Sequence, residues 1–387
     1  MKPLIQPRDY TDADSFKTEL ERVFLRRWIF ACATDGLEKD GDFRCIEVGG
    51  ISVVLQNFDG EVRAFNNVCS HRFARLQVNP CGNRELKCPY HGWIYNEAGL
   101  PYAIPKKPLI KEATPATLCD YRLSRWQVRT VGPLIFIRKE HANETLAEDD
   151  LEQQFGDFLE PLMQLASACG ELVENTTHVV KANWKLVVEN TLEGYHVDCV
   201  HPNTIGKLGI PGLSTNSSKE ATSATSSRFA FSGQNSAVFS PLNAQVSDRM
   251  DRTYKFLANR PQKLAGYRHF YFFPNFVIAS TRGESFSIQR ILPIDERTTE
   301  LTSFLFATNG LGELTKMETA LKKQFYASAA EFVRDIFVED AGICEQVQRS
   351  IGFAHGNGVL SDEEERICAF HQAYRAALAA SLNNQPN

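Results

Sequence analysis

Two short stretches of the sequence place cysteines and histidines at spacings that suit metal binding. In the first, Cys69 and His71 are followed, after sixteen intervening residues, by Cys88 and His91. Two thiolates and two imidazoles suit a [2Fe–2S] cluster in which cysteines hold one iron and histidines the other. Zinc is the alternative, but zinc fingers usually pair cysteine with cysteine and histidine with histidine, whereas each motif here contributes one of each. The first site is therefore predicted to carry electrons.

The second stretch holds His196 and His201, which are five residues apart. On an ideal helix such side chains diverge by roughly 140°, so they converge only if the helix ends or deforms between them. Pro202 favours such an end, because the residue before a proline is biased out of the helical region. Two histidines and a distant carboxylate would bind a mononuclear Fe(II) that keeps open positions for oxygen and substrate. Two unrelated core or surface histidines are the alternative.

The candidate carboxylate lies in a long helix predicted over residues 312–350. Asp340 falls within about 40° of the centre of the helix's apolar stripe. That stripe consists of Phe325, Ala329, Phe332, Ile336, Ile343 and Val347. A carboxylate on a buried stripe needs a counter-charge or a metal. A salt-bridged core aspartate is the alternative interpretation, and Glu339 is the alternative ligand.

The elements that would position these groups change character along the chain. A helix is expected over residues 11–28, and a β-rich region follows from residue 42 to residue 140, with an Asp-Gly hairpin turn at residues 59–60. Strands return between residues 267 and 308, before the long helix. The polar run at residues 214–227 is interpreted as a mobile surface loop.

Composition limits the classes of function. The chain has 387 residues and a net charge of −5, which gives no electrostatic footprint for nucleic acid. No window approaches the roughly 20 apolar residues that span a bilayer, and the N-terminus lacks the apolar core of a signal peptide. A cytoplasmic location without membrane contact is therefore predicted. The ten cysteines are scattered through a large chain, so a disulfide framework is not expected.

The residues around both motifs resemble a known family. Cys-Ser-His-Arg at residues 69–72 and Cys-Pro-Tyr-His-Gly-Trp at residues 88–93 are similar to the Rieske [2Fe–2S] motif. The frame Asn-Trp-Lys…Glu-Asn…Tyr-His at residues 183–196 resembles the catalytic domain of the Rieske non-haem iron oxygenases, the superfamily of aromatic-ring-hydroxylating dioxygenases. The resemblance covers essentially the whole chain.

This resemblance implies an α+β fold with an inserted domain. The β-rich Rieske domain would comprise residues 42–140. It would be inserted into a helix-grip catalytic domain, an antiparallel sheet with a long helix, which continues over residues 141–387. Residues 1–41 would form an N-terminal helical segment that packs on the catalytic domain.

The resemblance also implies a role for each candidate residue. Cys69, His71, Cys88 and His91 would hold the cluster, and His196, His201 and Asp340 would hold the mononuclear iron. Glu193, three positions before His196, would bridge to a cluster histidine of the neighbouring subunit in a trimer, and Asn190 would support the site. Many aromatic-ring dioxygenases have aspartate where this chain has Glu193. Glutamate there resembles the relatives that oxidise quaternary ammonium compounds.

The implied activity is that of the terminal oxygenase (alpha) component of a multicomponent system. It would use O2 to hydroxylate or oxidatively demethylate a small organic substrate, an aromatic compound or a quaternary amine, as a mono- or dioxygenase. The sequence has no Gly-x-Gly-x-x-Gly fingerprint, so a separate flavin-dependent NAD(P)H reductase, with or without a ferredoxin, is implied. A homotrimer, with or without a small β subunit, is expected. A Rieske electron carrier without oxygenase activity is the alternative.

Overall fold

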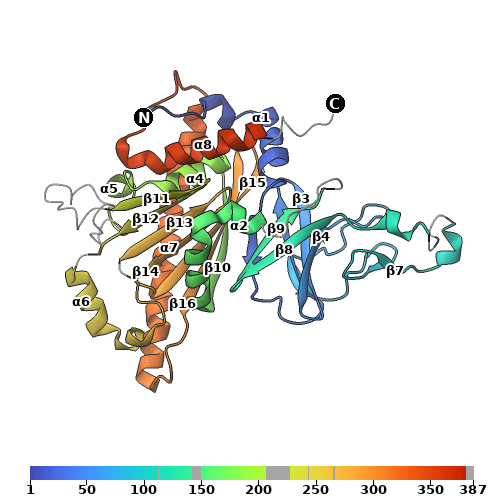
Figure 1. Ribbon diagram of the computed structural model, residues 1–387, viewed down its shortest axis with the longest axis horizontal. Helices are drawn as coiled ribbons and strands as arrows, with labels where there is room; N and C mark the ends of the chain where they lie inside the picture. The colour runs from blue at the N-terminus through green and yellow to red at the C-terminus, as the bar shows by residue number, and fades with distance from the viewer. Residues whose placement is uncertain are drawn as a thin grey trace. The chain divides into compact units, whose positions relative to one another are not determined.

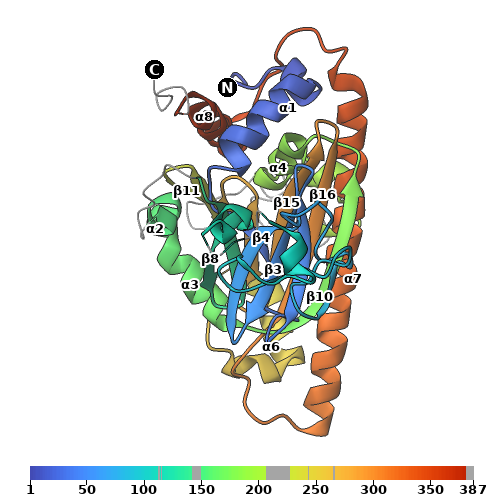
Figure 2. The same cartoon turned by 90° about the vertical axis from the view of Figure 1, so that its right-hand side faces the viewer.

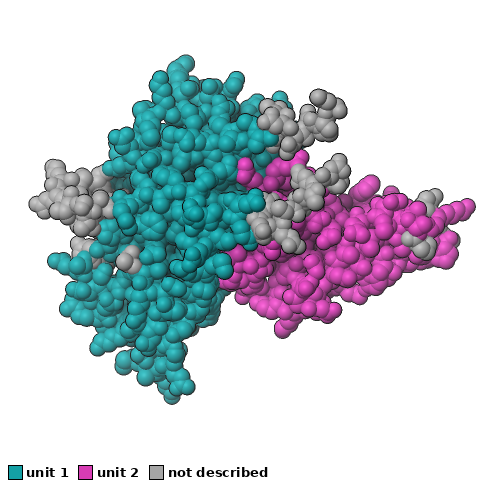
Figure 3. All heavy atoms as spheres, viewed as in Figure 1, with its two compact units in different colours: residues 1–24, 149–387 teal, residues 25–148 magenta. Residues whose placement is uncertain are grey.

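The structure is a computed structural model that describes residues 1–111, 114, 116–141, 150–205, 227–242, 244–264 and 266–380. The chain divides into two compact units (Figure 3). One comprises Met1–Phe24 and Asp149–Asn387, and the other comprises Leu25–Glu148. The loop predicted at residues 214–227 lies outside the described residues, except for Ser227. Among the described helices, none has the length and apolar character needed to cross a bilayer.

The smaller unit is built on an antiparallel sheet, whose strand order in the described residues is β1-β9-β8-β4-β3-β2-β5. Its strands are β1 (Ile29–Ala33), β2 (Asp42–Val48), β3 (Ile51–Phe58), β4 (Glu61–Asn66), β5 (Cys81–Asn83), β8 (Arg125–Val131) and β9 (Leu134–Lys139). A small second sheet pairs β6 (Ile94–Tyr95) with β7 (Pro101–Ala103). The predicted Asp-Gly hairpin is confirmed: Asp59 and Gly60 both have positive φ, as a tight turn between β3 and β4 requires.

The structure places the boundary of this unit earlier than the sequence predicted. Residues 25–41 were expected to belong to the N-terminal segment, but β1 pairs with β9 and is part of the smaller unit. All five residues of β1 are buried. A short, continuously apolar run shows no period of two, so the sequence pattern could not distinguish this strand from a helix.

The larger unit contains an antiparallel sheet of sequential hairpins, ordered β10-β16-β15-β14-β13-β12-β11 (Figure 1). Its strands are β10 (Cys169–Val180), β11 (Arg228–Ser232), β12 (Asn235–Ser240), β13 (Tyr267–Phe272), β14 (Phe276–Thr281), β15 (Ser285–Asp295) and β16 (Thr298–Thr308). Four of these strands match those predicted between residues 267 and 308, where alternating apolar residues made the pattern clear.

Helices lie on both faces of this sheet (Figure 2). On one face, the ring of Phe155 in α2 (Asp150–Phe155) packs against Phe272, next to α3 (Leu159–Ala168). On the other face lie α4 (Trp184–Leu192), α7 (Lys316–Ile351) and α8 (Glu365–Ala380). There Phe337 of α7 contacts His178, and Phe370 of α8 contacts Tyr271. We refer to this second face as the helix-grip face.

The long helix α7 turns a different stripe inward from the one predicted. Its buried residues are Tyr326, Ala330, Phe337, Cys344 and Gln348. Each follows a residue of the predicted stripe or of its continuation, so the helix is rotated by about 100° from the expected orientation. Asp340 still lies on the buried side, because it stands three residues after Phe337 and four before Cys344. The predicted start and end of the helix were close to those observed, Lys316–Ile351.

A buried polar cluster fixes α4, which leads into the second motif. The N-terminal helix α1 (Ala13–Glu19) is shorter than predicted and continues as a π-helical turn, Leu20–Phe24. Glu19 is fully buried and forms an ion pair with Lys185 of α4 at 2.6 Å. It also accepts hydrogen bonds from the indole of Trp184 and the hydroxyl of Tyr374 in α8. The carboxylate of Glu19 thus joins the N-terminal helix to α4 and α8. Its ion pair and hydrogen bonds offset the cost of burying its charge.

Candidate metal centres

The two histidines of the second motif flank a single helical turn. Helix α4 ends at Leu192, and the short helix α5 (Val197–Val200) follows after a turn. His196 is the N-cap residue of α5 and His201 its C-cap residue. The predicted helix end before Pro202 is therefore present. His196, however, lies at the start of α5 rather than on α4.

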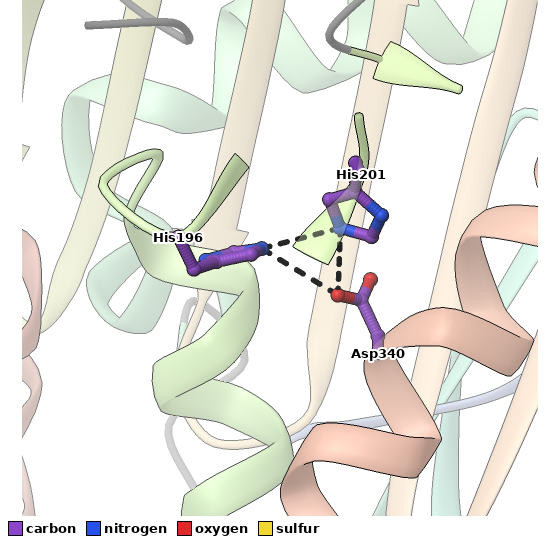
Figure 4. A group of neighbouring side chains, drawn as sticks. All are labelled: His196, His201 and Asp340. Carbon is purple, nitrogen blue, oxygen red and sulfur yellow. Dashed lines mark hydrogen bonds and ion pairs between the residues drawn. The ribbon is translucent and has the colours of Figure 1, made fainter. Parts of the chain in front are cut away.

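His196, His201 and Asp340 converge although they come from two distant parts of the chain (Figure 4). The carboxylate oxygen Oδ1 of Asp340 lies 2.9 Å from Nε2 of His201 and 3.5 Å from Nε2 of His196, and the two Nε2 atoms are 3.3 Å apart. Three ligands at right angles around a metal, with bonds of about 2.1 Å, are separated by about 3 Å. The described side chains therefore fit one face of an octahedral Fe(II) ion.

The electrostatics of the three groups suit a bound cation. Burial opposes the charge on Asp340, but hydrogen bonds from His196 and His201 outweigh it and lower the pKa of the carboxyl. For His196, burial is likewise outweighed, by hydrogen bonds to Asp340 and Glu193, which raise the pKa of the imidazole to about 9. When no metal is bound, protons on the imidazoles therefore offset the negative charge of Asp340. A metal ion would displace them, because ligating imidazoles must be neutral.

The second ring nitrogen of each histidine is held by a carboxylate. Nδ1 of His196 bonds to Oε1 of Glu193, and Nδ1 of His201 lies 2.7 Å from Oε2 of Glu339. Glu339 also accepts a hydrogen bond of 2.7 Å from the hydroxyl of Thr204. Such pairs fix which nitrogen of the ring faces a metal and raise its basicity. The sequence reasoning missed this contact of Glu339 and considered the residue only as an alternative ligand.

Replacing Glu339 with glutamine is expected to weaken Fe(II) binding at the mononuclear site by about 10- to 100-fold. The amide keeps the size of the side chain but loses the charge that orients His201. Titration of iron-depleted protein with Fe(II), with free metal buffered by a chelator, measures this affinity. Glu331→Gln is the matched control, because Glu331 is an exposed residue of the same helix. Equal affinity of the two variants would contradict the assigned contact.

Glu193 and Asn190 both lie beside His196. Both oxygens of Glu193 are engaged within the chain: Oε1 with the ring of His196, and Oε2 with the backbone N–H groups of Tyr195 and His196. The amide of Asn190 lies 3.5 Å from Nε2 of His196. The predicted bridge from Glu193 to a neighbouring subunit stays a prediction, while its contact with His196 is an additional role.

The first motif forms two loops of the smaller unit. Cys69 and Cys88 are buried, and the rings of His71 and His91 are 4.6 Å apart. Nδ1 of His71 is buried and has no hydrogen-bond partner. Two buried thiols beside two imidazoles, one of which has an unpartnered buried nitrogen, fit a Rieske cluster. All ten cysteines are free in the structure.

Hydrogen bonds and ring stacking fix the position of the first loop, which carries Cys69 and His71. The hydroxyl of Tyr95 lies 3.1 Å from Sγ of Cys69 and 3.0 Å from Oγ of Ser70. The hydroxyl of Ser70 in turn donates to the backbone oxygen of Tyr121 at 2.7 Å. The ring of His71 stacks parallel to Trp93 at 5.0 Å. These contacts orient two of the four candidate ligands of the cluster.

Comparison with known proteins agrees with this division of the chain. Residues 170–380 match the family described as the ring hydroxylating alpha subunit (catalytic domain), and residues 27–114 match the Rieske [2Fe–2S] domain. The chain therefore belongs to the ring-hydroxylating alpha subunit family and carries a Rieske domain. The resemblance inferred from the motifs is confirmed, and so is the α+β fold that it implied. A Rieske cluster and a mononuclear iron are the cofactors of this domain pair.

Curated relatives include two oxygenase subunits with different substrates in their names. The chain is 33% identical to the glycine betaine monooxygenase oxygenase subunit of Pseudomonas aeruginosa, over 51% of this chain and 45% of the relative. It is 30% identical to the anthranilate 1,2-dioxygenase large subunit of Acinetobacter baylyi, over 51% of this chain and 42% of the relative. The matched region thus spans about half the length of these relatives.

A solved structure shows the same fold over nearly the whole chain. It is a quaternary ammonium Rieske monooxygenase, described in connection with carnitine oxidation by gut microbiota and inter-subunit electron transfer. The TM-score is 0.71, with 21% sequence identity over 98% of this chain and 94% of the other. At this identity, the similarity defines the fold alone.

Proposed function

We propose that this chain is the terminal oxygenase component of a multicomponent Rieske system. Its substrate would be a small organic molecule that is hydroxylated or oxidatively demethylated with O2. The observation that carries the proposal is the convergence of His196, His201 and Asp340 on one point, with ligand separations of 2.9 to 3.5 Å. A protein that only carried electrons would need the first motif and not this second one.

The residues divide into two sets with separate tasks. Cys69, His71, Cys88 and His91 would hold the [2Fe–2S] cluster, and His196, His201 and Asp340 would hold Fe(II). When bound, these groups supply one-electron transfer and oxygen activation respectively. The two imidazoles and the carboxylate would hold the ion from one side, which would leave positions for O2 and substrate. Glu193 and Glu339 keep the Nε2 atoms of the two histidines directed at that ion.

The proposed assembly includes partners that the chain itself does not provide. A flavin-dependent NAD(P)H reductase, with or without a ferredoxin, would deliver electrons to the cluster. A homotrimer would let the cluster of one subunit serve the iron of the next, with Glu193 at the junction. The inter-subunit electron transfer named for the solved relative supports this arrangement. The expected location of the protein is the cytoplasm. The names of the two curated relatives support either a quaternary amine or an aromatic acid as substrate.

Protein purified without oxygen is expected to be red-brown and to contain about three irons per chain, two in the cluster and one mononuclear. Iron and acid-labile sulfide assays measure both. Cys88→Ser should abolish the visible colour, because it removes a cluster thiolate, and it should leave about one iron. Zinc at the first site without labile sulfide would exclude the Rieske assignment. Two irons per chain, with none outside the cluster, would favour the electron carrier.

A further inference from the structure

Burial in the central strands of the larger sheet is uneven. On the face toward α2 and α3, residues of β14 and β15 such as Ile278, Phe286 and Ile288 are fully buried. On the helix-grip face, the alternating residues of the same strands are only half-buried: Ala279, Thr281, Ser285, Ser287 and Gln289. Helices cover this face too. Ala279, Ser287 and Gln289 lie within the strands, whereas Thr281 and Ser285 form the last pair before the hairpin turn. The half-burial of the three inner positions therefore marks a hollow beneath the helices, and we call all five residues the floor.

The floor begins at the point along β15 where α4 no longer packs on the helix-grip face. Helix α4 packs against β15, and Ile291, on the helix-grip face, is fully buried. Two residues along the same face, Gln289 is half-buried, and its amide oxygen is buried without a hydrogen-bond partner. Helix α4 itself ends at Leu192, just before the turn that carries His196. The floor is thus adjacent to the chain segment that carries His196 and His201, two of the three candidate iron ligands.

A buried guanidinium lies along one edge of this floor. Nη2 of Arg366, in α8, is 3.1 Å from Nδ1 of His269, and Nε donates to the hydroxyl of Ser236 at 3.1 Å. His269 pairs directly with Ala279 of the floor, at a strand spacing of about 4.8 Å. Nη1 donates to the backbone oxygen of Leu192. Arg366 therefore connects the floor with the start of the His196 turn.

The charge of Arg366 is uncompensated within the described part of the chain. Its hydrogen bonds go to neutral acceptors, and the titratable groups that act on it are Tyr267 and Tyr271. Burial and the guanidinium together hold the pKa of His269 well below its usual range, so that this imidazole is neutral. A buried charge without a counter-charge is costly. An anionic ligand on the floor would reduce this cost, and a cationic ligand would increase it.

We propose that the floor is the substrate-binding surface of the mononuclear iron centre, and that it selects small organic molecules bearing a carboxylate. The inference rests on the proposed function and narrows its substrate class. The carboxylate lies at the Arg366 edge, where it supplies the missing counter-charge. The short side chains of Ala279, Ser285 and Ser287 leave room for the body of the molecule, and Gln289 offers an acceptor to a polar substituent. A substrate whose only charge is positive is disfavoured.

Two series of equal shape and different charge test this selection. Calorimetric titration of the anaerobic holoenzyme with benzoate, benzamide and benzamidinium measures the effect of charge on an aromatic body. Isobutyrate, isobutyramide and isobutyramidinium do the same for an aliphatic body. In at least one series, the carboxylate is expected to bind at least tenfold more tightly than the amide, and the amidinium most weakly. Equal affinities, a preference for the cation, or no binding in either series would overturn the proposal.

A pair of variants locates the selection on the floor. Ala279→Asp supplies a carboxylate beside His269 and Arg366, whereas Ala279→Asn has the same shape without the charge. The carboxylate ligand is expected to bind at least tenfold more weakly to the Asp variant than to the Asn variant, with the order reversed for the amidinium. Thermal unfolding of both variants checks that they are folded. If the two variants bind each ligand alike, the anion does not lie on this floor.

The calorimetry does not depend on catalysis, so the inference and the proposed function can fail separately. Iron and sulfide are measured in the same samples. Absence of the mononuclear iron would contradict the proposed oxygenase function itself. A full complement of iron together with no preference for the carboxylate ligand would contradict only the proposed substrate class.

Discussion

Asp340→Ala protein is expected to lose its mononuclear iron and all detectable product formation while keeping its cluster. The variant removes the one negatively charged member of the triad, so the two imidazoles remain without the charge that offsets a divalent cation. The ligands proposed for the cluster, Cys69, His71, Cys88 and His91, lie in the other compact unit, so its visible spectrum and its reduction by dithionite should be unchanged. His196→Ala is expected to give the same result, for the same reason.

The decisive measurement is iron per chain together with turnover driven by NADH through a surrogate reductase. Asp340→Ala should hold about two irons, against about three in the unmodified protein. Asp335→Ala is the matched control, because Asp335 lies on the same helix and is exposed. If Asp340→Ala retained three irons and full activity, another carboxylate would have to be the ligand. Glu339, which contacts the same histidine, would be examined next.

The parts of the site that the sequence revealed are those defined by short-range spacing. Two Cys-His pairs and two histidines before a proline are recognisable because metal chemistry requires those residue types close together. Asp340 was identified from the helical period, even though the predicted stripe was displaced by one residue. That displacement did no harm, because a position three residues after one buried residue and four before another stays on the buried side.

The contacts that escaped prediction depend on tertiary geometry. Whether Glu339 reaches His201 is decided by the rotation of α7 and by the orientation of an imidazole on another segment. Arg366 meets His269 across 97 residues of sequence, and no local pattern connects them. Strand β1 was missed because its five buried residues leave no alternation to read. Periodicity indicates which side of an element is buried, but it does not identify the element that packs against that side.

Glu193→Gln is expected to slow electron transfer to the mononuclear centre even when Fe(II) is supplied in excess, so that both metals stay near full occupancy. Glu193 is assigned as a ligand of neither centre. Both of its oxygens already accept hydrogen bonds within the chain, yet a carboxylate has about four acceptor sites. A cluster histidine of a neighbouring subunit can therefore be a further donor. Glutamine keeps one acceptor oxygen and the size of the side chain, but it loses the charge that strengthens such a bond.

The expected size of the effect follows from that charge. A hydrogen bond to a charged group contributes about 1.5–3 kcal/mol, which corresponds to a rate loss of about tenfold to a few hundredfold if it acts wholly on the transition state. We expect a larger loss, because the bridge also positions the two centres relative to each other. Single-turnover mixing of reduced protein with O2 and substrate measures cluster reoxidation and product formation together. Glu193→Asp, which retains the charge, is expected to lose less.

Comparison with Glu339→Gln separates coupling from simple orientation of a ligand. Each glutamate holds Nδ1 of one histidine, so both variants disturb one ligand in a similar way. If Glu193 acted only through His196, Glu193→Gln would weaken Fe(II) binding as Glu339→Gln does, and iron-saturated samples of both would reoxidise their clusters at similar rates. If Glu193 also joins the cluster of the neighbouring subunit, only Glu193→Gln slows reoxidation when iron is saturating. Unmodified rates of reoxidation and product formation in iron-saturated Glu193→Gln would remove the bridge and leave Glu193 with its contact to His196 alone.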